Sequence, residues 1–503
     1  MKRTTLWIRI ILITLSTLMM LTLLAACQNG KKDPADTSDK KVATTEDLYD
    51  DKGKLKDKLD GLSFGKQISV LSGAEQKWAL GSTDEMKGHV IGEAIYVRNA
   101  TVEERLNLEI KWDSQPNFDT SSQSVFMQRL EADIKGSHSY DCTASYNLLP
   151  YTLAMKGYCT NLADTKHIDL TGPWWPSAFL DHLMYQDQIY ALVTSSGKGT
   201  LENLSAIFFN NELIEAHKLE SPYDKVANNE WTVGTLKEMI KGTYIDLNSD
   251  SKVDGNDQFG LSTSTNARLT CWYVGMGVRM VTKNAAGELE LTAGEEKIGD
   301  AIDDIVDLFS TNDSMLVDPN NGSNNNFAMF TEKRAVFYLA TLYMAEYCSN
   351  NNLELNYGVV PNPKMDSSQD RYYTHIPNNH AIWYIPQGVK DVDFSSAFIE
   401  CMASESYRYL EPIYYENCVK LRYAPDERLA EMYDLVRESI SFDMNYVFRF
   451  VYQKDCDTWI RNCISQPNKY SWSSSWESMR TTVTSNFESI VAYYDDVAAG
   501  ETK

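Results

Sequence analysis

The sequence predicts an α/β protein built from two lobes. Short β-branched and aromatic runs alternate with stretches of helical periodicity, a pattern that indicates βαβ units around a parallel sheet. Some 440 residues follow Gly61, which exceeds the roughly 250–300 residues at which a single hydrophobic core stops growing. We therefore expect two lobes.

The expected elements can be placed in order along the chain. The first strand is the β-branched run 67–73 (QISVLSG), and a helical pattern follows at 92–106 (GEAIYVRNATVEERL). The last 90 or so residues are expected to be helical, with 432–439 (MYDLVRES) as a representative amphipathic stretch. Further strands are expected at 109–112, 140–144, 205–209, 334–339, 357–360 and 382–385, and further helices at 125–135 and 231–241.

The N-terminus has the organisation of an export signal. Lys2, Arg3 and Arg9 precede an apolar run at 10–24, which is too short for a membrane span of roughly 20 apolar residues. The run ends in Leu-Ala-Ala-Cys27, which resembles the lipobox of bacterial lipoproteins. This resemblance implies a signal peptide at 1–26, acyl chains on Cys27, and a lipid-anchored protein on the extracellular face of the bacterial membrane.

Residues 27–60 are expected to form a disordered tether. The segment is rich in Lys, Asp, Ser and Thr and has almost no aliphatic side chains, so it cannot bury enough surface to offset its ordering entropy. Fully extended it would reach on the order of 100 Å at ~3.3 Å per residue.

The charge of the chain excludes some partners. The formal net charge is −23, and removing the three positive charges of 1–26, which contains no acid, leaves −26. This argues against nucleic acid and against a basic membrane-docking patch, and it suits a soluble protein that binds an uncharged solute. Eight of the nine cysteines follow Cys27, and their spacings match no zinc pattern. An even number permits disulfides, but buried free thiols explain them equally well.

Several fragments, taken together, resemble the family 1 extracellular solute-binding proteins. Residues 97–110 (VRNATVEERLNLEI) resemble a conserved family stretch, and Pro173-Trp174-Trp175 followed by 188–192 (QIYAL) resembles another. The remaining fragments run in order over nearly the whole mature chain: Tyr140-Asp141, 207–213 (IFFNNEL), 230–232 (EWT), 357–364 (YGVVPNPK) and 414–432.

The resemblance implies a two-lobe, periplasmic-binding-protein-like fold of type II, the Venus flytrap. Lobe 1 would comprise 61–192 and 374–410, lobe 2 would comprise 193–373, and a helical tail at 411–503 would pack mainly on lobe 2. Hinges are expected at 190–196 and 374–379. Such a protein, expected to be a monomer, captures a sugar or oligosaccharide between its lobes, and the permease subunits of an ABC importer recognise the closed form.

One loop has the spacing of a calcium site. Oxygen-bearing side chains stand at positions one, three, five, nine and twelve, and a backbone carbonyl at position seven completes the six to eight oxygens that Ca²⁺ needs. Position six is Ser251 rather than Gly, and position twelve is Asp rather than Glu. The alternative is a polar surface turn without metal; similar loops followed by Phe259-Gly-Leu in the resembling family favour a structural Ca²⁺ site. The expected ligands are Asp246, Asn248, Asp250, Lys252, Asp254 and Asp257.

No enzyme signature is present in the sequence. The chain contains no HExxH, no GxSxG and no complete phosphate-binding loop. His375 and His380 are expected to be ordinary loop histidines. A glycoside hydrolase would need two carboxylates across a bond, and nothing singles out such a pair. Besides the hydrolase, a binder of peptide or another solute and a calcium-dependent adhesin stay open as alternatives.

The aromatic content of 11 % (17 Phe, 11 Trp and 29 Tyr) favours a sugar ligand, because flat apolar faces stack on pyranose rings. In open α/β sheets, ligands bind beyond the carboxyl ends of the strands. Trp174 and Trp175 are expected to pack rather than to stack on the ligand. The residues expected to contact it are Trp78, Tyr146, Asn147, Asn203, Arg268, Trp272, Tyr343 and Trp472.

Overall fold

The computed structural model describes most of the chain after residue 55, within one compact unit, Leu55–Lys503. The predicted signal peptide, the lipidated Cys27 and most of the tether therefore lie outside the described residues, and so does Cys418. The described ranges are 56–81, 90–117, 124–194, 197–266, 268–317, 326–351, 353–377, 380–415, 427–442, 444, 448 and 456–501.

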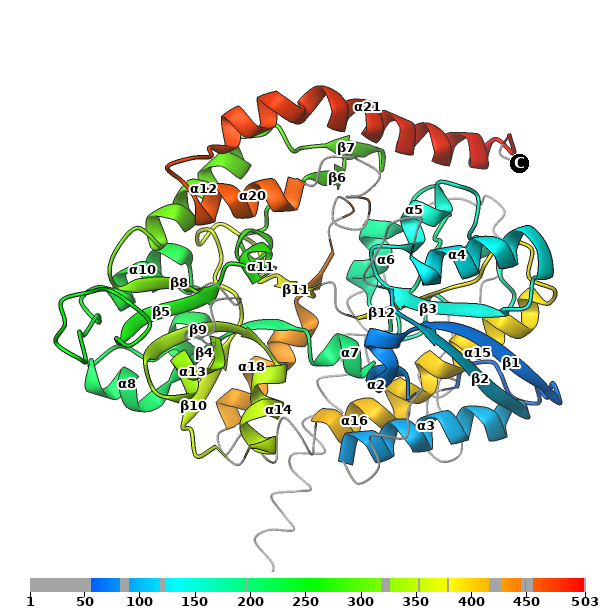
Figure 1. Cartoon of the computed structure of the whole chain (residues 1–503), viewed down its shortest axis with the longest axis horizontal. Coiled ribbons are helices and arrows are strands. Elements are labelled where there is room, and N and C mark those ends of the chain that lie inside the picture. Colours follow the sequence, from blue (N-terminus) through cyan, green and yellow to red (C-terminus); the bar gives the residue numbers. More distant parts are fainter. Residues whose placement is uncertain are drawn as a thin grey trace, which may run out of the picture. The chain divides into compact units, whose positions relative to one another are not determined.

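The first sheet has four strands in the order β12-β3-β1-β2, and we call it with its helices lobe 1 (Figure 1). β1 pairs in parallel with β2 and with β3, with Val70 opposite both Trp112 and Cys142. Helix α3 connects β1 to β2 and α4 connects β2 to β3, which gives the expected βαβ units. The elements are β1 (Lys66–Gly73), α3 (Val90–Leu106), β2 (Leu108–Gln115), α4 (Val125–Ala132), β3 (Cys142–Tyr146) and the antiparallel edge strand β12 (Ala381–Tyr384).

The second sheet has five strands in the order β10-β4-β9-β5-β8, and we call it with its helices lobe 2. Its central strands are buried on both faces. One cluster of buried hydrophobic side chains includes residues of both sheets. Two of its strands, β5 and β8, were not predicted. The strands are β4 (Ser205–Asn210), β5 (Phe259–Ser264), β8 (Ser314–Val317), β9 (Ala335–Thr341) and β10 (Tyr357–Val360), and the helices are α8 (Asn211–Ala216), α9 (Pro222–Ala227), α10 (Val233–Ile240), α11 (Arg268–Gly275), α12 (Glu296–Leu308), α13 (Asn326–Thr331) and α14 (Tyr343–Asn350).

The chain passes between the two sheets where the hinges were expected. On the way to lobe 2, Leu192 forms an isolated bridge with Trp383, and the short helix α7 (Lys198–Leu201) follows. On the way back, β11 (Thr374–His375) pairs in parallel with β13 (Ile440–Ser441) of the C-terminal segment. A third stretch of chain therefore lies beside the return crossing. The hinge role of these segments stays a prediction.

The C-terminal segment contacts both lobes, and its packing mainly on lobe 2 stays a prediction. Helix α21 (Trp472–Ala498) begins against α12, α20 (Cys456–Ser465) and the strand β7 (Leu289–Leu291). Its far end reaches lobe 1, where the Tyr494 ring packs on Tyr185 at 5.3 Å and the Tyr494 carbonyl accepts a hydrogen bond from Gln188. Figure 1 shows α21 (red) extending from α12 and α20 toward α5 (Pro150–Ala154).

The predicted tether ends earlier than residue 60. Asp57 and Leu59 are both buried, at 2 % exposed, because Asp57 accepts hydrogen bonds from Arg105, Arg408 and Ser404. The folded part of the chain therefore includes residues that composition alone assigned to the tether. Asp57, a charged residue of the predicted tether, is the centre of a buried ion-pair cluster.

Seven of the eight cysteines after Cys27 lie in described parts of the chain, and all seven are buried free thiols. They are Cys142, Cys159, Cys271, Cys348, Cys401, Cys456 and Cys463. These seven residues are therefore free thiols rather than disulfide partners.

Candidate functional site

Three strand ends of lobe 1 meet in a polar cluster. Asn117, just beyond β2, is fully buried, and its backbone N–H donates to the Glu75 carboxylate at 3.0 Å. With its amide oriented to satisfy its donors, the Asn117 oxygen accepts from the Tyr146 backbone at 2.9 Å and its nitrogen donates to Glu75 at 2.7 Å. Gly73 leaves room for this arrangement, since a Cβ there would lie 2.0 Å from both Asn117 Nδ2 and Gln76 Oε1. The carboxyl ends of β1, β2 and β3 are thereby tied together.

Trp78 stands beside this cluster on the short helix α2 (Lys77–Leu80) and is 39 % exposed. The carbonyl of Leu80, at the end of α2, accepts hydrogen bonds from Arg98 and Asn99, each at 3.0 Å. These two residues belong to the family-like stretch 97–110, and they fix the turn that presents Trp78. An exposed tryptophan on an anchored turn is available to stack on a ligand.

Lobe 2 contributes a second aromatic side chain at its own strand ends. Tyr343 follows β9, is 39 % exposed and packs at 6.2 Å from the Phe327 ring of α13. Arg268 follows β5 at the start of α11, where its N–H donates to Asn266 at 3.0 Å, and its guanidinium lies 6.0 Å from the Phe327 centroid. Arg268, Phe327 and Tyr343 therefore form one group at the carboxyl edge of β5 and β9.

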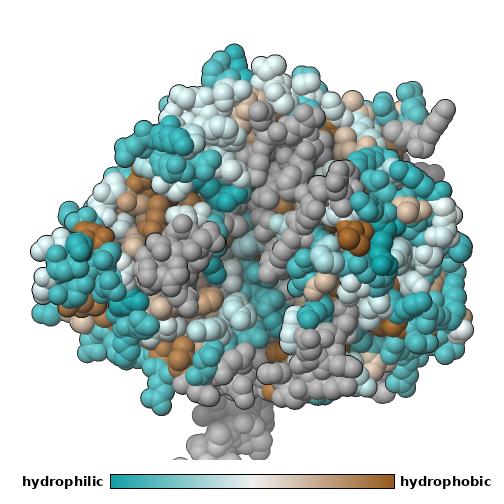
Figure 2. Space-filling model, in the orientation of Figure 1, coloured by the Kyte–Doolittle hydropathy of each residue, from teal (hydrophilic) through white to brown (hydrophobic). Residues whose placement is uncertain are grey.

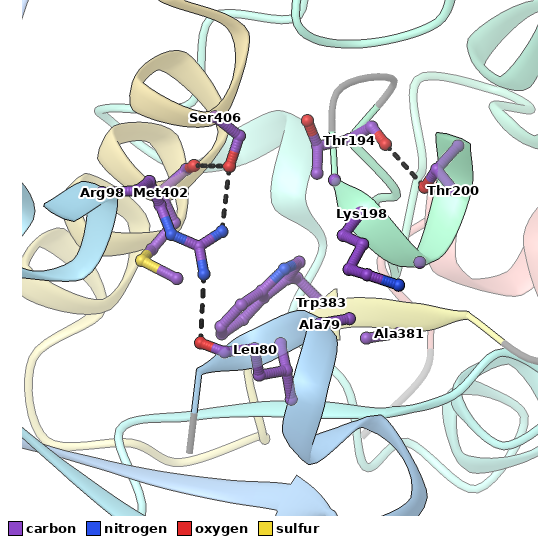
Figure 3. A pocket seen from close by; sticks show the side chains of 12 residues that line it. Ala79, Leu80, Arg98, Thr194, Lys198, Thr200, Ala381, Trp383, Met402 and Ser406 are labelled. Atoms are coloured by element: carbon purple, nitrogen blue, oxygen red, sulfur yellow. Dashed lines mark hydrogen bonds between the residues drawn. The ribbon is translucent and has the colours of Figure 1, made fainter. Parts of the chain in front are cut away.

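Thr194 and residues 197–200 of the crossing segment line a small pocket together with residues of lobe 1 (Figure 3). A Cβ on Gly199 would lie 3.4 Å from that of Ala79, and Lys198 is buried with ion pairs to Glu202 and Glu346. The pocket encloses about 30 Å³, which suits a water molecule and not a sugar ring. Its lining includes Arg98, Thr194, Lys198, Trp383, Met402 and Ser406.

Figure 2, in the orientation of Figure 1, shows hydrophilic surface in the middle of the molecule, between the regions of β5 and β1. Sugar-sized binding clefts combine such polar surface with a few aromatic faces. We therefore take the two strand-end edges, with Trp78 and Tyr343 on opposite sides, as the candidate site.

The structure places the predicted ligand-binding residues in different environments. Trp78, Tyr146, Arg268 and Tyr343 are partly exposed at the strand ends. Asn147 is buried, with no hydrogen-bond partner for Oδ1 among the described residues, and Asn203 donates to the Gly199 carbonyl at 2.7 Å. Each of these roles stays a prediction.

Two predicted ligand residues belong to the core instead. Trp272 is fully buried and packs edge-on against Phe309 at 5.7 Å. Trp472 is buried and stacks on Trp476 at 6.1 Å. A side chain without exposed surface cannot stack on a solute, so we assign both residues to packing. Trp174 and Trp175 are buried, as expected.

The sequence reasoning overlooked Glu75, Gln76, Asn117 and Phe327. The first three have a recognisable signal, because they follow the ends of β1 and β2 as Tyr146 follows β3. Phe327 has none, because it precedes β9 and reaches the edge only through the fold.

The acidic loop 246–257 is closed by an antiparallel bridge between Ile245 and Gln258. Ser251, at the position that calcium loops give to Gly, has φ of 63°, the left-handed conformation that this glycine supplies. Asp257 is fully buried and accepts from the Tyr244 hydroxyl at 3.0 Å. Its Oδ1 and that of Asp246 are buried without a donor among the described residues.

Buried carboxylate oxygens such as those of Asp246 and Asp257 are the ligands that a hard cation prefers. The carboxylates of the loop, however, do not surround a common point. Within the described ranges, no three His, Cys, Asp or Glu side chains form a group that could hold a metal. Metal binding would therefore have to draw the loop together.

The fold is that of two-lobe solute-binding proteins, which confirms the predicted fold class. A sugar-binding protein of Xanthomonas citri matches with a TM-score of 0.55 at 10 % identity, over 86 % of this chain and 98 % of its own. An ABC substrate-binding protein of Listeria monocytogenes, solved with cycloalternan, matches with a TM-score of 0.51 at 12 % identity, over 87 % and 100 %. A cyclic α-maltosyl-1,6-maltose binding protein of Arthrobacter globiformis matches with a TM-score of 0.51 at 11 % identity, over 86 % and 99 %.

No protein-family model matches the sequence, and no curated protein matches it. Among the helices in the described ranges, none has both the length and the apolar character that a membrane crossing requires.

Proposed function

We propose that the chain is the lipid-anchored, extracellular substrate-binding protein of an ABC importer and captures a sugar or oligosaccharide between its lobes. The observation that carries this proposal is the pair Trp78 and Tyr343, one at the strand ends of each lobe and each 39 % exposed. Large aromatic side chains are normally buried, whereas here one from each lobe presents its ring at the edge where ligands bind in open sheets.

The comparisons support a carbohydrate as the ligand. The structures from Xanthomonas citri and Arthrobacter globiformis are described as sugar- or maltosyl-maltose-binding, and that from Listeria monocytogenes holds cycloalternan. Each protein has the same fold at low identity, so the ligand is transferred here as a proposal. The lipobox-like sequence ending in Cys27 supports the anchor, and the fold supports binding rather than catalysis.

Calorimetric titration with a panel of oligosaccharides and peptides tests this function directly. We expect an oligosaccharide to bind and to decrease the radius of gyration, because ligand between the lobes favours the closed form. Binding of peptides alone would contradict the carbohydrate proposal, and new reducing ends in the bound oligosaccharide would identify a hydrolase.

The lipid anchor has a separate test. Cells fed radiolabelled fatty acid should label the wild-type chain but not Cys27→Ala, which should be released from membranes or stay unprocessed. An unlabelled wild-type chain would exclude lipidation and leave solute binding untouched.

We also propose that loop 246–257 binds a structural Ca²⁺ through Asp246, Asn248, Asp250, Asp254 and Asp257 and the Lys252 carbonyl. The buried, donor-free oxygens of Asp246 and Asp257 and the left-handed Ser251 support it. Free metal at 100-fold above its Kd would stabilise the fold by about 3 kcal/mol. Chelator should therefore lower the Tm of the wild type but not of Asp250→Ala. Equal melting with and without chelator would leave the loop as a polar turn.

A further inference from the structure

Arg268 carries a positive charge that no acid in the described part of lobe 2 neutralises. Its guanidinium lies 6.0 Å from the centroid of the Phe327 ring, and its Nε is buried without a hydrogen-bond acceptor among the described residues. A guanidinium is a five-donor group that carboxylates match in a bidentate manner. In a chain with 70 acidic and 47 basic residues, an arginine left without an acid at a candidate site indicates a missing partner.

Three hydroxyl groups without a hydrogen-bond partner among the described residues lie on one face of the lobe 2 sheet. Ser262 and Tyr338 stand opposite each other on β5 and β9, and Ser264 lies two residues along β5. All three are fully buried, and their hydroxyl oxygens have no partner within the described residues. Tyr338 stacks on Phe330 of α13, the helix that also carries Phe327 beneath Arg268. Tyr338 and Arg268 therefore both pack against aromatic side chains of α13.

Three acids in the described parts of the chain around this group already have partners. Glu202 and Glu346 both pair with Lys198, and the Tyr343 N–H donates to the Glu202 backbone carbonyl. Asp457, on the other side of α11, accepts from Thr270, Tyr273 and Arg461. None of these carboxylates is an ion-pair partner of Arg268.

We propose that the solute is an acidic carbohydrate whose uronic-acid carboxylate binds Arg268. This inference rests on the proposed function and names its substrate class, which differs from the uncharged solute that the net charge suggested. Long-range repulsion from the acidic chain does not exclude it, because charges beyond a Debye length of about 8–10 Å are largely screened.

The test compares acidic oligosaccharides with their own methyl esters, over several uronic acids and linkages, by calorimetric titration of the purified protein. Each acid and its ester differ only at the carboxyl group, which is charged in the acid and a neutral methyl ester in its counterpart. We expect the acid to bind about 10- to 100-fold more tightly than its ester, and Arg268→Gln to remove that preference. Arg268→Lys keeps the positive charge but loses the bidentate guanidinium, so it should retain part of the preference for acid over ester.

Two controls separate a local effect from a general one. Arg334→Gln also removes one positive charge from lobe 2, but Arg334 pairs with Glu332, so the preference for acid over ester should persist. The ligand-free Tm of Arg268→Gln should match that of the wild type, because no ion pair is lost.

The outcomes distinguish the inference from the function on which it rests. Tightest binding of a neutral or sulfated sugar, or an acid preference that survives in Arg268→Gln, would overturn the inference and leave carbohydrate binding in place. If neither acids, esters nor neutral sugars bind, the carbohydrate function itself is wrong.

Discussion

The indole nitrogen of Trp174 donates a hydrogen bond to the carboxylate of Glu400 at 3.0 Å, across 226 residues of sequence. The indole of Trp175 donates to the other carboxylate oxygen at 3.1 Å. Both tryptophans and Glu400 are buried, so a single acid on α15 (Val392–Glu405) positions the Pro-Trp-Trp segment of lobe 1.

This acid should make stability depend on pH. Burial raises the pKa of Glu400 from 4.5 to about 8, against the effect of its hydrogen bonds. Between those values the unfolded chain has released the proton and the folded chain retains it, so stability falls as pH rises, by up to about 1.4 kcal/mol per pH unit. Urea unfolding from pH 5 to 8 should show this slope in the wild type and a smaller one in Glu400→Gln. Parallel curves for the two proteins would contradict the assignment.

Asp57 should contribute stability with the opposite pH dependence. Burial alone would raise its pKa, but hydrogen bonds from Arg105 and Ser404 and the charges of Arg105 and Arg408 outweigh burial and hold it well below 3.8. The contribution is therefore complete above about pH 4 and is lost as the pH falls further. At neutral pH, Asp57→Asn should cost about 3–5 kcal/mol, because it breaks the buried ion pairs of Asp57 with Arg105 and Arg408 and leaves these two arginines to share Glu405.

Asp60→Asn is the matched control for Asp57→Asn. It removes the same charge from the same segment, but the Asp60 side chain is 86 % exposed. Its unfolding free energy should stay within about 0.5 kcal/mol of the wild type. An equal loss in both variants would contradict the buried cluster.

Trp78 and Trp272 should separate ligand binding from packing. Trp78→Ala should weaken solute binding by roughly 1–3 kcal/mol, about 10- to 100-fold, with little change in the ligand-free Tm. Trp272→Ala should cost about 3–5 kcal/mol of stability, because it empties a buried site against Phe309. A large loss of stability in Trp78→Ala, with affinity unchanged, would remove Trp78 from the site.

Helix α21 should be held at its two ends by independent contacts. Tyr494→Ala should cost about 3–5 kcal/mol and increase amide hydrogen exchange in residues 485–498, because Tyr494 contacts Tyr185 and Gln188 of lobe 1. Residues 472–483 should stay protected, since α12 and α20 hold them. Tyr494→Phe is the control, because the hydroxyl has no partner among the described residues. Increased exchange along the whole helix would show that it docks as one unit.

The regular part of the fold could be predicted from local patterns. The run 67–73 and the helical stretch 92–106 appear as β1 and α3 within two residues, since alternation and helical periodicity are local properties. Strand β5 (FGLSTS) was missed because its Gly, Ser and Thr residues give no apolar run, although neighbouring strands bury it completely. The expectation that ligands bind beyond the carboxyl ends of strands selected Trp78 and Tyr343 for the candidate site. The same expectation was wrong for Trp272, because the side chain packs against Phe309.

The sequence by itself determined the α/β class, the two lobes, and the residues that follow each strand, because these depend on periodicity, length and chain order. Only the tertiary structure decided that Asp57 is buried rather than solvated, that α21 contacts both lobes, and that Glu400 holds two indoles. Each depends on contacts between residues distant in sequence, and the balance of burial against pairing at such a contact has no local signal.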